Sequence, residues 1–316
     1  MVASLPGGRP PPVDDRPRIA LLTGAGNTSD GTIARELAGI VSPALALELA
    51  VDNAAPHAPA NPTLSIVTYD AIRPSVHGRQ PGERAAGAVR VVTPLYLEEM
   101  HFIARRDSPL AFIHEMRGQR INIGPVGSAN RLTAARAYER MFGSPLPVGH
   151  ALARSDAAAL RDLIRGNVDV VVVVQAQPVH WLAQVPPEIA RSIKLLKLDP
   201  EHPSTQSAIE DYLPASIRAD SYGGWLEQDA QTLATMAFMV TSGDPDAATT
   251  RHLETVVKAL CSSLPALRRE GHRKWREVQL GLRIEGGWKS WPPAEQWFQS
   301  CTAAQRAGVV LANPRK

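Results

Sequence analysis

The hydrophobic pattern of the chain alternates between short apolar runs and longer amphipathic segments. An apolar run at 18–23 precedes a glycine turn and a helical pattern over 30–50, which is interrupted near Ser42-Pro43. A second apolar run follows at 64–68. Strand, helix and strand in this order favour a parallel sheet.

A second unit repeats this order farther along the chain. Its predicted elements are a strand at 120–123, a glycine turn at 124–130, helices at 131–142 and 156–165, and a buried strand at 169–174. Other predicted elements are two strand-like runs on either side of Pro94 within 89–105, strands from 193 and at 232–241, and helices at 246–263 and 265–280. The two units predict an α/β fold whose glycine turns face a shared cleft, where helix N-termini favour anions.

The composition is that of a globular protein with a sizeable core. Its 316 residues are 44% hydrophobic and suggest two domains. Thirty-four basic against 31 acidic residues give a net charge of only +3, which does not favour nucleic acid. The most basic segment, 268–276, is interpreted as the solvated end of a helix. The longest apolar run, 170–174, is far shorter than the ~18 residues of a membrane span, so no direct membrane insertion is expected.

The glycine turns lack the usual nucleotide-binding motifs. A phosphate-binding loop needs a lysine after its last glycine, and neither turn has one. Ser29 stands where a dinucleotide fingerprint needs its third glycine. Hydrolase and zinc-protease motifs are absent too, so the sequence predicts no catalytic residue, metal or cofactor. Cys261 and Cys301 could pair in an oxidising compartment or remain buried thiols.

Four segments share their order and spacing with a known family. They are TGAG at 23–26, SIVTYDAI at 65–72, LYLEEMHFIARRDSPL at 95–110 and RGQRINIGPVGSANRLTAARAYERMFG at 117–143. Together they resemble the TAXI-type extracytoplasmic solute receptors of tripartite (TRAP) transporters. The resemblance implies a two-lobed periplasmic-binding-protein fold of type II arrangement, each lobe being a mixed, mainly parallel sheet flanked by helices.

The resemblance also implies how the chain is divided and what it does. Residues 18–97 with 240–316 would form lobe one and 98–239 lobe two, after a disordered segment at 1–17. The lobes would close on a small anionic or zwitterionic molecule, such as a carboxylate or an amino acid. A monomeric receptor would then deliver this ligand to the membrane subunits of a TRAP-type transporter.

Polar residues near the predicted cleft are the candidate ligand contacts. Lobe one would contribute Thr23, Gly24, Asn27, Thr28, Thr68 and Tyr69. The crossover would contribute Tyr96 and Glu98, and lobe two would contribute Ser128, Asn130, Arg131, Gln175 and Gln177. In this interpretation Arg131 pairs with a ligand carboxylate, Tyr96 is an aromatic wall and Glu98 accepts from a ligand ammonium.

Several candidates have a structural alternative. These are helix capping for Ser128 and Asn130, core packing for Tyr96, a surface position for Arg131, a solvated pair with Glu99 for Glu98, and a hydrogen-bonded loop for Gln175 and Gln177.

The sequence departs from the family pattern at three places that would face the ligand. They are 27–30, where Asn-Thr-Ser-Asp replaces a glycine-rich step, 129–130, where Ala-Asn replaces Gly-Thr, and Leu97, where proline is usual. The ligand could therefore be bulkier or more polar than is typical.

The residues also leave the compartment open. The first 18 residues contain no apolar secretory segment, so the protein is either cytoplasmic or exported with its signal removed. The alternative function is therefore a cytoplasmic or signalling sensor of the same fold, and an enzyme is less favoured.

Overall fold

The computed structural model describes residues 17–23, 28–51, 64–73, 89–223, 225–243, 245–282 and 289–311. The candidate ligand residues Gly24 and Asn27 lie outside the described residues, as does the N-terminal segment up to residue 16.

The N-terminal elements follow the predicted order, with one correction. They are β1 (Arg18–Thr23), α1 (Ser29–Val41), β2 (Ala46–Val51), β3 (Leu64–Thr68) and the short α2 (Tyr69–Ile72). The prediction that a helix spans 30–50 is wrong beyond Val41. Pro43 cannot continue the hydrogen-bonding ladder, and the chain returns as β2, which pairs in parallel with β1.

Two long strands run through the middle of the molecule. They are β4 (Val89–Arg105) and β10 (Ala230–Ser242), which pair in antiparallel fashion. The separate runs predicted on either side of Pro94 form one strand. Pro94 lies beside an irregularity of the β4–β10 register, a position where a strand tolerates a residue without an amide hydrogen.

Most other elements lie between β4 and β10 in the sequence. They are η1 (Ile113–Met116), β5 (Ile121–Asn122), α3 (Ala129–Phe142), η2 (Val148–His150), β6 (Ala151–Leu152), α4 (Asp156–Ile164), β7 (Val170–Gln175), α5 (His180–Ala183), α6 (Pro187–Ala190), β8 (Ile193–Leu195), α7 (Pro203–Ala208), β9 (Leu213–Ile217) and η3 (Ala219–Ser221).

The C-terminal part is helical and differs from the two helices predicted there. It contains α8 (Ala247–Glu270), η4 (Arg273–Arg276) and α9 (Pro292–Leu311). Helix α8 continues through Pro265, where the sequence suggests a new helix. Leu264 and Leu267 pack into the same core as the earlier apolar residues of α8, so tertiary packing maintains the helix across the proline.

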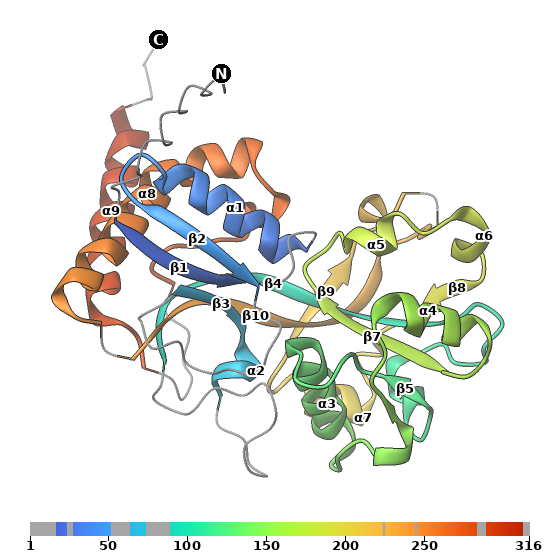
Figure 1. The fold of residues 1–316 in the computed structure, drawn as a ribbon. Helices are drawn as coiled ribbons and strands as arrows, with labels where there is room; N and C mark the ends of the chain where they lie inside the picture. The colour runs from blue at the N-terminus through green and yellow to red at the C-terminus, as the bar shows by residue number, and fades with distance from the viewer. Residues whose placement is uncertain are drawn as a thin grey trace, which may run out of the picture.

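The described strands form one mixed sheet in the order β2-β1-β3-β10-β4-β7-β5-β6, with β8 beside β4 and β9 beside β10. Pairs near the two ends of this order are parallel, and those made by β4 and β10 are antiparallel. Figure 1 shows β4 and β10 running between two groups of elements, one with α1, α8 and α9 and the other with α3 to α7. The predicted two-lobed α/β fold is confirmed.

Apolar side chains gather at either end of these strands. The first core contains Leu21, Leu37, Tyr96 and Leu260, and draws on residues 19–96 and 237–301 with Ala176. The second core covers both faces of the sheet around β7 and draws on residues 100–233. The exact division of the chain at residues 97 and 239 stays a prediction.

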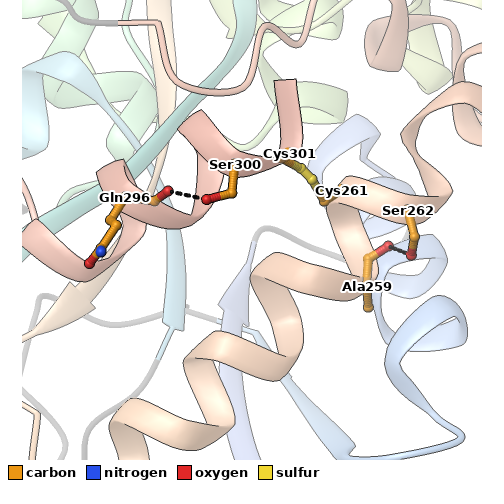
Figure 2. Close-up of a disulfide and its surroundings, with 6 residues drawn as sticks. All are labelled: Ala259, Cys261, Ser262, Gln296, Ser300 and Cys301. Carbon is orange, nitrogen blue, oxygen red and sulfur yellow. Dashed lines mark hydrogen bonds between the residues drawn. A yellow bond between two sulfur atoms is a disulfide. The ribbon is translucent and has the colours of Figure 1, made fainter. Parts of the chain in front are cut away.

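A disulfide attaches the last helix to the first core. Cys261 of α8 is bonded to Cys301 of α9, as Figure 2 shows, and their Cα atoms lie 6.1 Å apart. Cys301 packs in the first core beside Phe298. The question that the sequence leaves open is answered: the two cysteines are paired.

Removing this bond should destabilise the protein. The bond closes a 40-residue separation, for which the chain-entropy argument gives about 4 kcal/mol of stabilisation. We expect the Cys261→Ala/Cys301→Ala variant to unfold at lower denaturant concentration than the wild type. A reductant should lower the wild-type midpoint and leave that of the variant unchanged. Equal midpoints of the oxidised wild type and the variant would contradict the prediction.

Candidate functional site

A strip of polar side chains lies between the two cores on one face of the sheet. Thr235 of β10 stands opposite Glu98 of β4, and directly opposite residues of antiparallel strands share a face. Two positions away on either side, Ala237 packs in the first core and Leu233 in the second. Since alternate residues of a strand face the same side, Thr235 and Glu98 mark the boundary between the cores.

The start of α1 places a second carboxyl over this strip. Thr28 caps α1 by accepting from the Gly31 amide at 3.1 Å, and Asp30 follows in the first turn. The Tyr96 hydroxyl donates to Asp30 Oδ1 at 2.6 Å, and the Asp30 and Glu98 carboxyls hydrogen-bond to each other. Glu98 is 5% exposed, so the alternative of a solvated pair with Glu99 is wrong.

The two carboxyls cannot both be charged at low cost. Burial raises the pKa of Asp30, although the hydrogen bonds with Tyr96 and Glu98 oppose the rise. Burial and then the charge of Asp30 hold the pKa of Glu98 well above its usual range. Adjacent like charges disfavour double ionisation, so the pair keeps a proton to higher pH than a separate, solvated carboxyl would.

The far side of the strip is closed by contacts between α2 and α3. Thr68 lies 3.4 Å from Thr133 between the hydroxyl oxygens. Tyr212 donates to Asp70 Oδ1 at 3.0 Å, and Arg136 Nη1 donates to the Asp70 carbonyl at 2.5 Å. Burial raises the pKa of Asp70 to about 6, with the nearby Arg136 guanidinium opposing the rise.

The second glycine turn is held by Asn130 at the start of α3. Its amide donates to the Ile123 and Val172 carbonyls, and its oxygen accepts from the Val174 amide. Gly124 has a φ of +87°, and a Cβ there would lie 2.8 Å from Asn130 Nδ2, so the turn requires glycine. Asn130 therefore uses its donors and its acceptor to fix the turn on β7.

Ser128 caps α3. The Arg131 amide donates to Ser128 Oγ at 3.2 Å, and this hydroxyl in turn donates to the Pro125 carbonyl. No acidic residue lies in the first turn of α3, in contrast to α1. Because the Ser128 hydroxyl is used in capping, the groups suited to a ligand anion at this helix N-terminus are the backbone amides of the turn.

Three other predicted contacts have partners outside the strip in this structure. Arg131 donates to the Gly124 carbonyl at 3.4 Å and lines a cavity of about 180 Å³ together with Leu146. Tyr69 packs with Val67 against a smaller apolar cluster around Phe238, on the opposite face of β10 from Thr235. Gln175 stands opposite Glu99, the neighbour of Glu98 that points to the other face.

Gln177 belongs to a buried network on that other face. Glu99 accepts from the Gln177 amide and side chain and, at 2.6 Å, from Lys274 Nζ. The Gln177 oxygen accepts from the Arg218 amide and the Ser221 hydroxyl. The hydrogen-bonded loop suggested for Gln177 is thus present. Lys274 is 1% exposed, so the interpretation of its segment as a solvated helix end is wrong at this residue.

The hydroxyls of two predicted residues, Thr23 and Thr68, are buried. Thr23, at the end of β1, is 4% exposed, and Thr68 is 3% exposed. Among the described residues, the Thr23 and Thr235 hydroxyls have no hydrogen-bond partner. The structure thus brings Thr28, Tyr96, Glu98 and Thr68 to the strip.

Sequence reasoning did not single out Asp30 and Thr235, which the structure places beside Glu98. Asp30 stands within the departure at 27–30, which could have signalled it. Thr235 has no local signal, because only the strand register places it beside Glu98.

The profile of the NMT1-like family matches residues 48–289, which is more than half of the chain. The chain belongs to the NMT1-like family. No curated protein sequence matches it. Three solved structures similar to this family member are the periplasmic binding protein BugD, a TctC solute-binding protein from Polaromonas, and the arginine-, lysine-, histidine-binding protein ArtJ from Geobacillus stearothermophilus.

The structural similarity spans nearly the whole chain. BugD is 16% identical with a TM-score of 0.50, covering 93% of this chain and 98% of its own. The TctC protein is 14% identical with a TM-score of 0.44, and the match covers 93% of this chain and 100% of the TctC chain. ArtJ is 14% identical with a TM-score of 0.45, and the match covers 82% of this chain and 94% of the ArtJ chain. At 16% identity the BugD comparison shows the fold, which is that of a periplasmic binding protein. Among the described helices, none is both long and apolar enough to cross a membrane.

Replacing Lys274 should cost more than replacing an exposed lysine. Lys274→Met leaves the Glu99 carboxylate buried without its cation, which typically costs about 3–5 kcal/mol. Urea unfolding would measure the loss, and Lys274→Met/Glu99→Gln should recover part of it. The control is Lys258→Met, whose exposed pair with Glu254 is worth less than ~1 kcal/mol. A similar loss in both single variants would contradict the buried pair.

Asp70 should make stability depend on pH. A carboxyl whose folded-state pKa of about 6 exceeds its unfolded value stabilises the fold fully below pH 3.8 and loses that contribution as pH rises through 6. The free energy of unfolding of Asp70→Asn relative to wild type should therefore rise by up to roughly 3 kcal/mol between pH 4 and pH 7. Asp107→Asn, at an exposed pair, is the control. A pH-independent difference for Asp70→Asn would disprove the assignment.

Proposed function

We propose that the protein is an extracytoplasmic receptor that binds a small carboxylate or amino-acid-like molecule between its two cores and delivers it to a TRAP-type transporter. The observation that carries the proposal is the polar strip around Glu98 and Thr235. It lies where two packed cores meet across a pair of crossing strands, the place where a hinge motion would open and close.

The residue chemistry supports a small polar ligand. Buried hydroxyls without partners, as at Thr23 and Thr235, are costly in a core that binds nothing. The N-terminus of α3 offers backbone amides for a carboxylate, while Ser128 and Thr28 keep both helix starts in place. Arg131 is adjacent to the α3 turn and would reach a carboxylate by leaving the Gly124 carbonyl.

The disulfide supports an extracytoplasmic location. Disulfides persist in oxidising compartments and are rare in reducing ones. The family and fold are those of solute-binding proteins, which favours ligand capture over catalysis. The TRAP-type membrane partner and the monomeric state rest on the sequence resemblance described above.

Ligand binding should raise the melting temperature. We expect at least one compound in a panel of mono- and dicarboxylates and amino acids to raise it, because a solute that binds only the folded protein stabilises it by mass action. Calorimetry would give Kd, and small-angle scattering should show a smaller radius of gyration with that compound. Thr68→Val and Arg131→Ala should weaken binding about tenfold or more, and Glu48→Gln, at an exposed pair, should not. A panel without any stabilising compound would refute the proposed function.

A further inference from the structure

The N-termini of α1 and α3 differ in charge although both adjoin the polar strip. A helix N-terminus carries a partial positive charge and favours anions. In α1 that end already has its own acid, because Asp30 lies in the first turn and hydrogen-bonds Glu98. A ligand carboxylate placed beside α1 would meet two further carboxyls. The first turn of α3 has no acid, so a ligand anion fits there instead.

The carboxyl pair has a neighbour that indicates a ligand. Thr235 stands directly opposite Glu98 on the same sheet face, is 2% exposed, and its hydroxyl has no partner among the described residues. A buried hydroxyl without a partner is an unsatisfied acceptor as well as a donor. Two carboxyls and a hydroxyl oxygen are the acceptors that a three-donor ammonium group needs.

We propose that Asp30, Glu98 and Thr235 form a subsite for an organic ammonium group, which displaces the proton that the two carboxyls share. The ligand is then a zwitterion whose ammonium points to α1 and whose carboxylate points to α3. This proposal rests on the proposed function and specifies the ligand class of the same site.

The proton balance is simple. In this proposal, the two carboxyls hold one proton and one negative charge before binding. The ligand brings its ammonium already protonated, the shared proton leaves to the solvent, and both carboxyls then face the ammonium as carboxylates. The positive charge of the ammonium favours the ionised carboxylates. This attraction offsets the desolvation of the two carboxylates and their mutual repulsion.

Other charged groups near the pair do not replace the ligand cation. Glu99 and Lys274 act on Glu98 from β4 and η4, but Lys274 is directly bonded to Glu99 and Glu277. Tyr96 donates to Asp30 and stays neutral, because burial raises its pKa well above the usual value. The proposal therefore assigns the compensating cation at Asp30 and Glu98 to an ammonium from outside the protein.

Matched probes test the subsite. L-glutamate and L-leucine carry an ammonium, and glutarate and 4-methylpentanoate are the same skeletons without it. We expect at least one amino acid to bind ten times or more tighter than its partner acid. At pH 6–7 its binding enthalpy should differ between phosphate and Tris buffers, as release of up to one proton requires. Its affinity should increase with pH, by up to about tenfold per unit.

Variants separate this subsite from the general binding function. Asp30→Asn and Glu98→Gln should each abolish proton release and remove the preference for the amino acid, and Thr235→Val should reduce that preference. Exposed Glu48→Gln should change neither. If an acid binds as well as its amino acid, or if binding releases no proton, the subsite is wrong while solute binding stands. If no amino acid probe binds, the subsite is also wrong, and the wider panel separately decides the receptor function.

Discussion

The antiparallel pairing of β4 with β10 is the constraint on which the rest of the structure depends. Both strands start in one core and end in the other, so every residue near their midpoint lies between two packed regions. Alternation then assigns neighbouring residues to opposite faces of the sheet. Glu98 and Glu99 are adjacent in sequence, yet they have different hydrogen-bond partners, Asp30 for Glu98 and Lys274 with Gln177 for Glu99.

The two carboxyls show how the partner decides the state of a buried acid. Glu99 meets the Lys274 ammonium and the Gln177 amide, so its charge is compensated and the C-terminal segment is fixed to the crossing strands. Glu98 meets another carboxyl, and its pKa rises because neither burial nor Asp30 favours a second charge. The first arrangement stabilises one conformation. We propose that the second is a site whose charge changes when a ligand cation binds.

Local patterns predicted those parts of the fold that short segments determine by themselves. The apolar runs at 18–23 and 64–68 and the glycine turn at 124–130 are where the sequence places them, and the family resemblance gave the two-lobed arrangement. Lys274 was misjudged because its burial depends on Glu99, 175 residues away. The helix boundary at Pro265 was misjudged for the same reason, since core packing overrides a local break. Thr235 could not be found without the strand register.

The candidate site lies where local rules for a stable core are broken. A protein selected only for stability would not place a buried Glu98 carboxyl against the half-buried Asp30 carboxyl and an unpaired Thr235 hydroxyl between two well-packed cores. On the opposite face of the same strands, the polar groups of Gln177 and Glu99 are satisfied by the chain itself. The contrast between the two faces separates a structural network from the groups that we propose a ligand completes. It also favours Asp30 and Glu98 over Gln175 and Gln177 as the residues that determine what the protein binds.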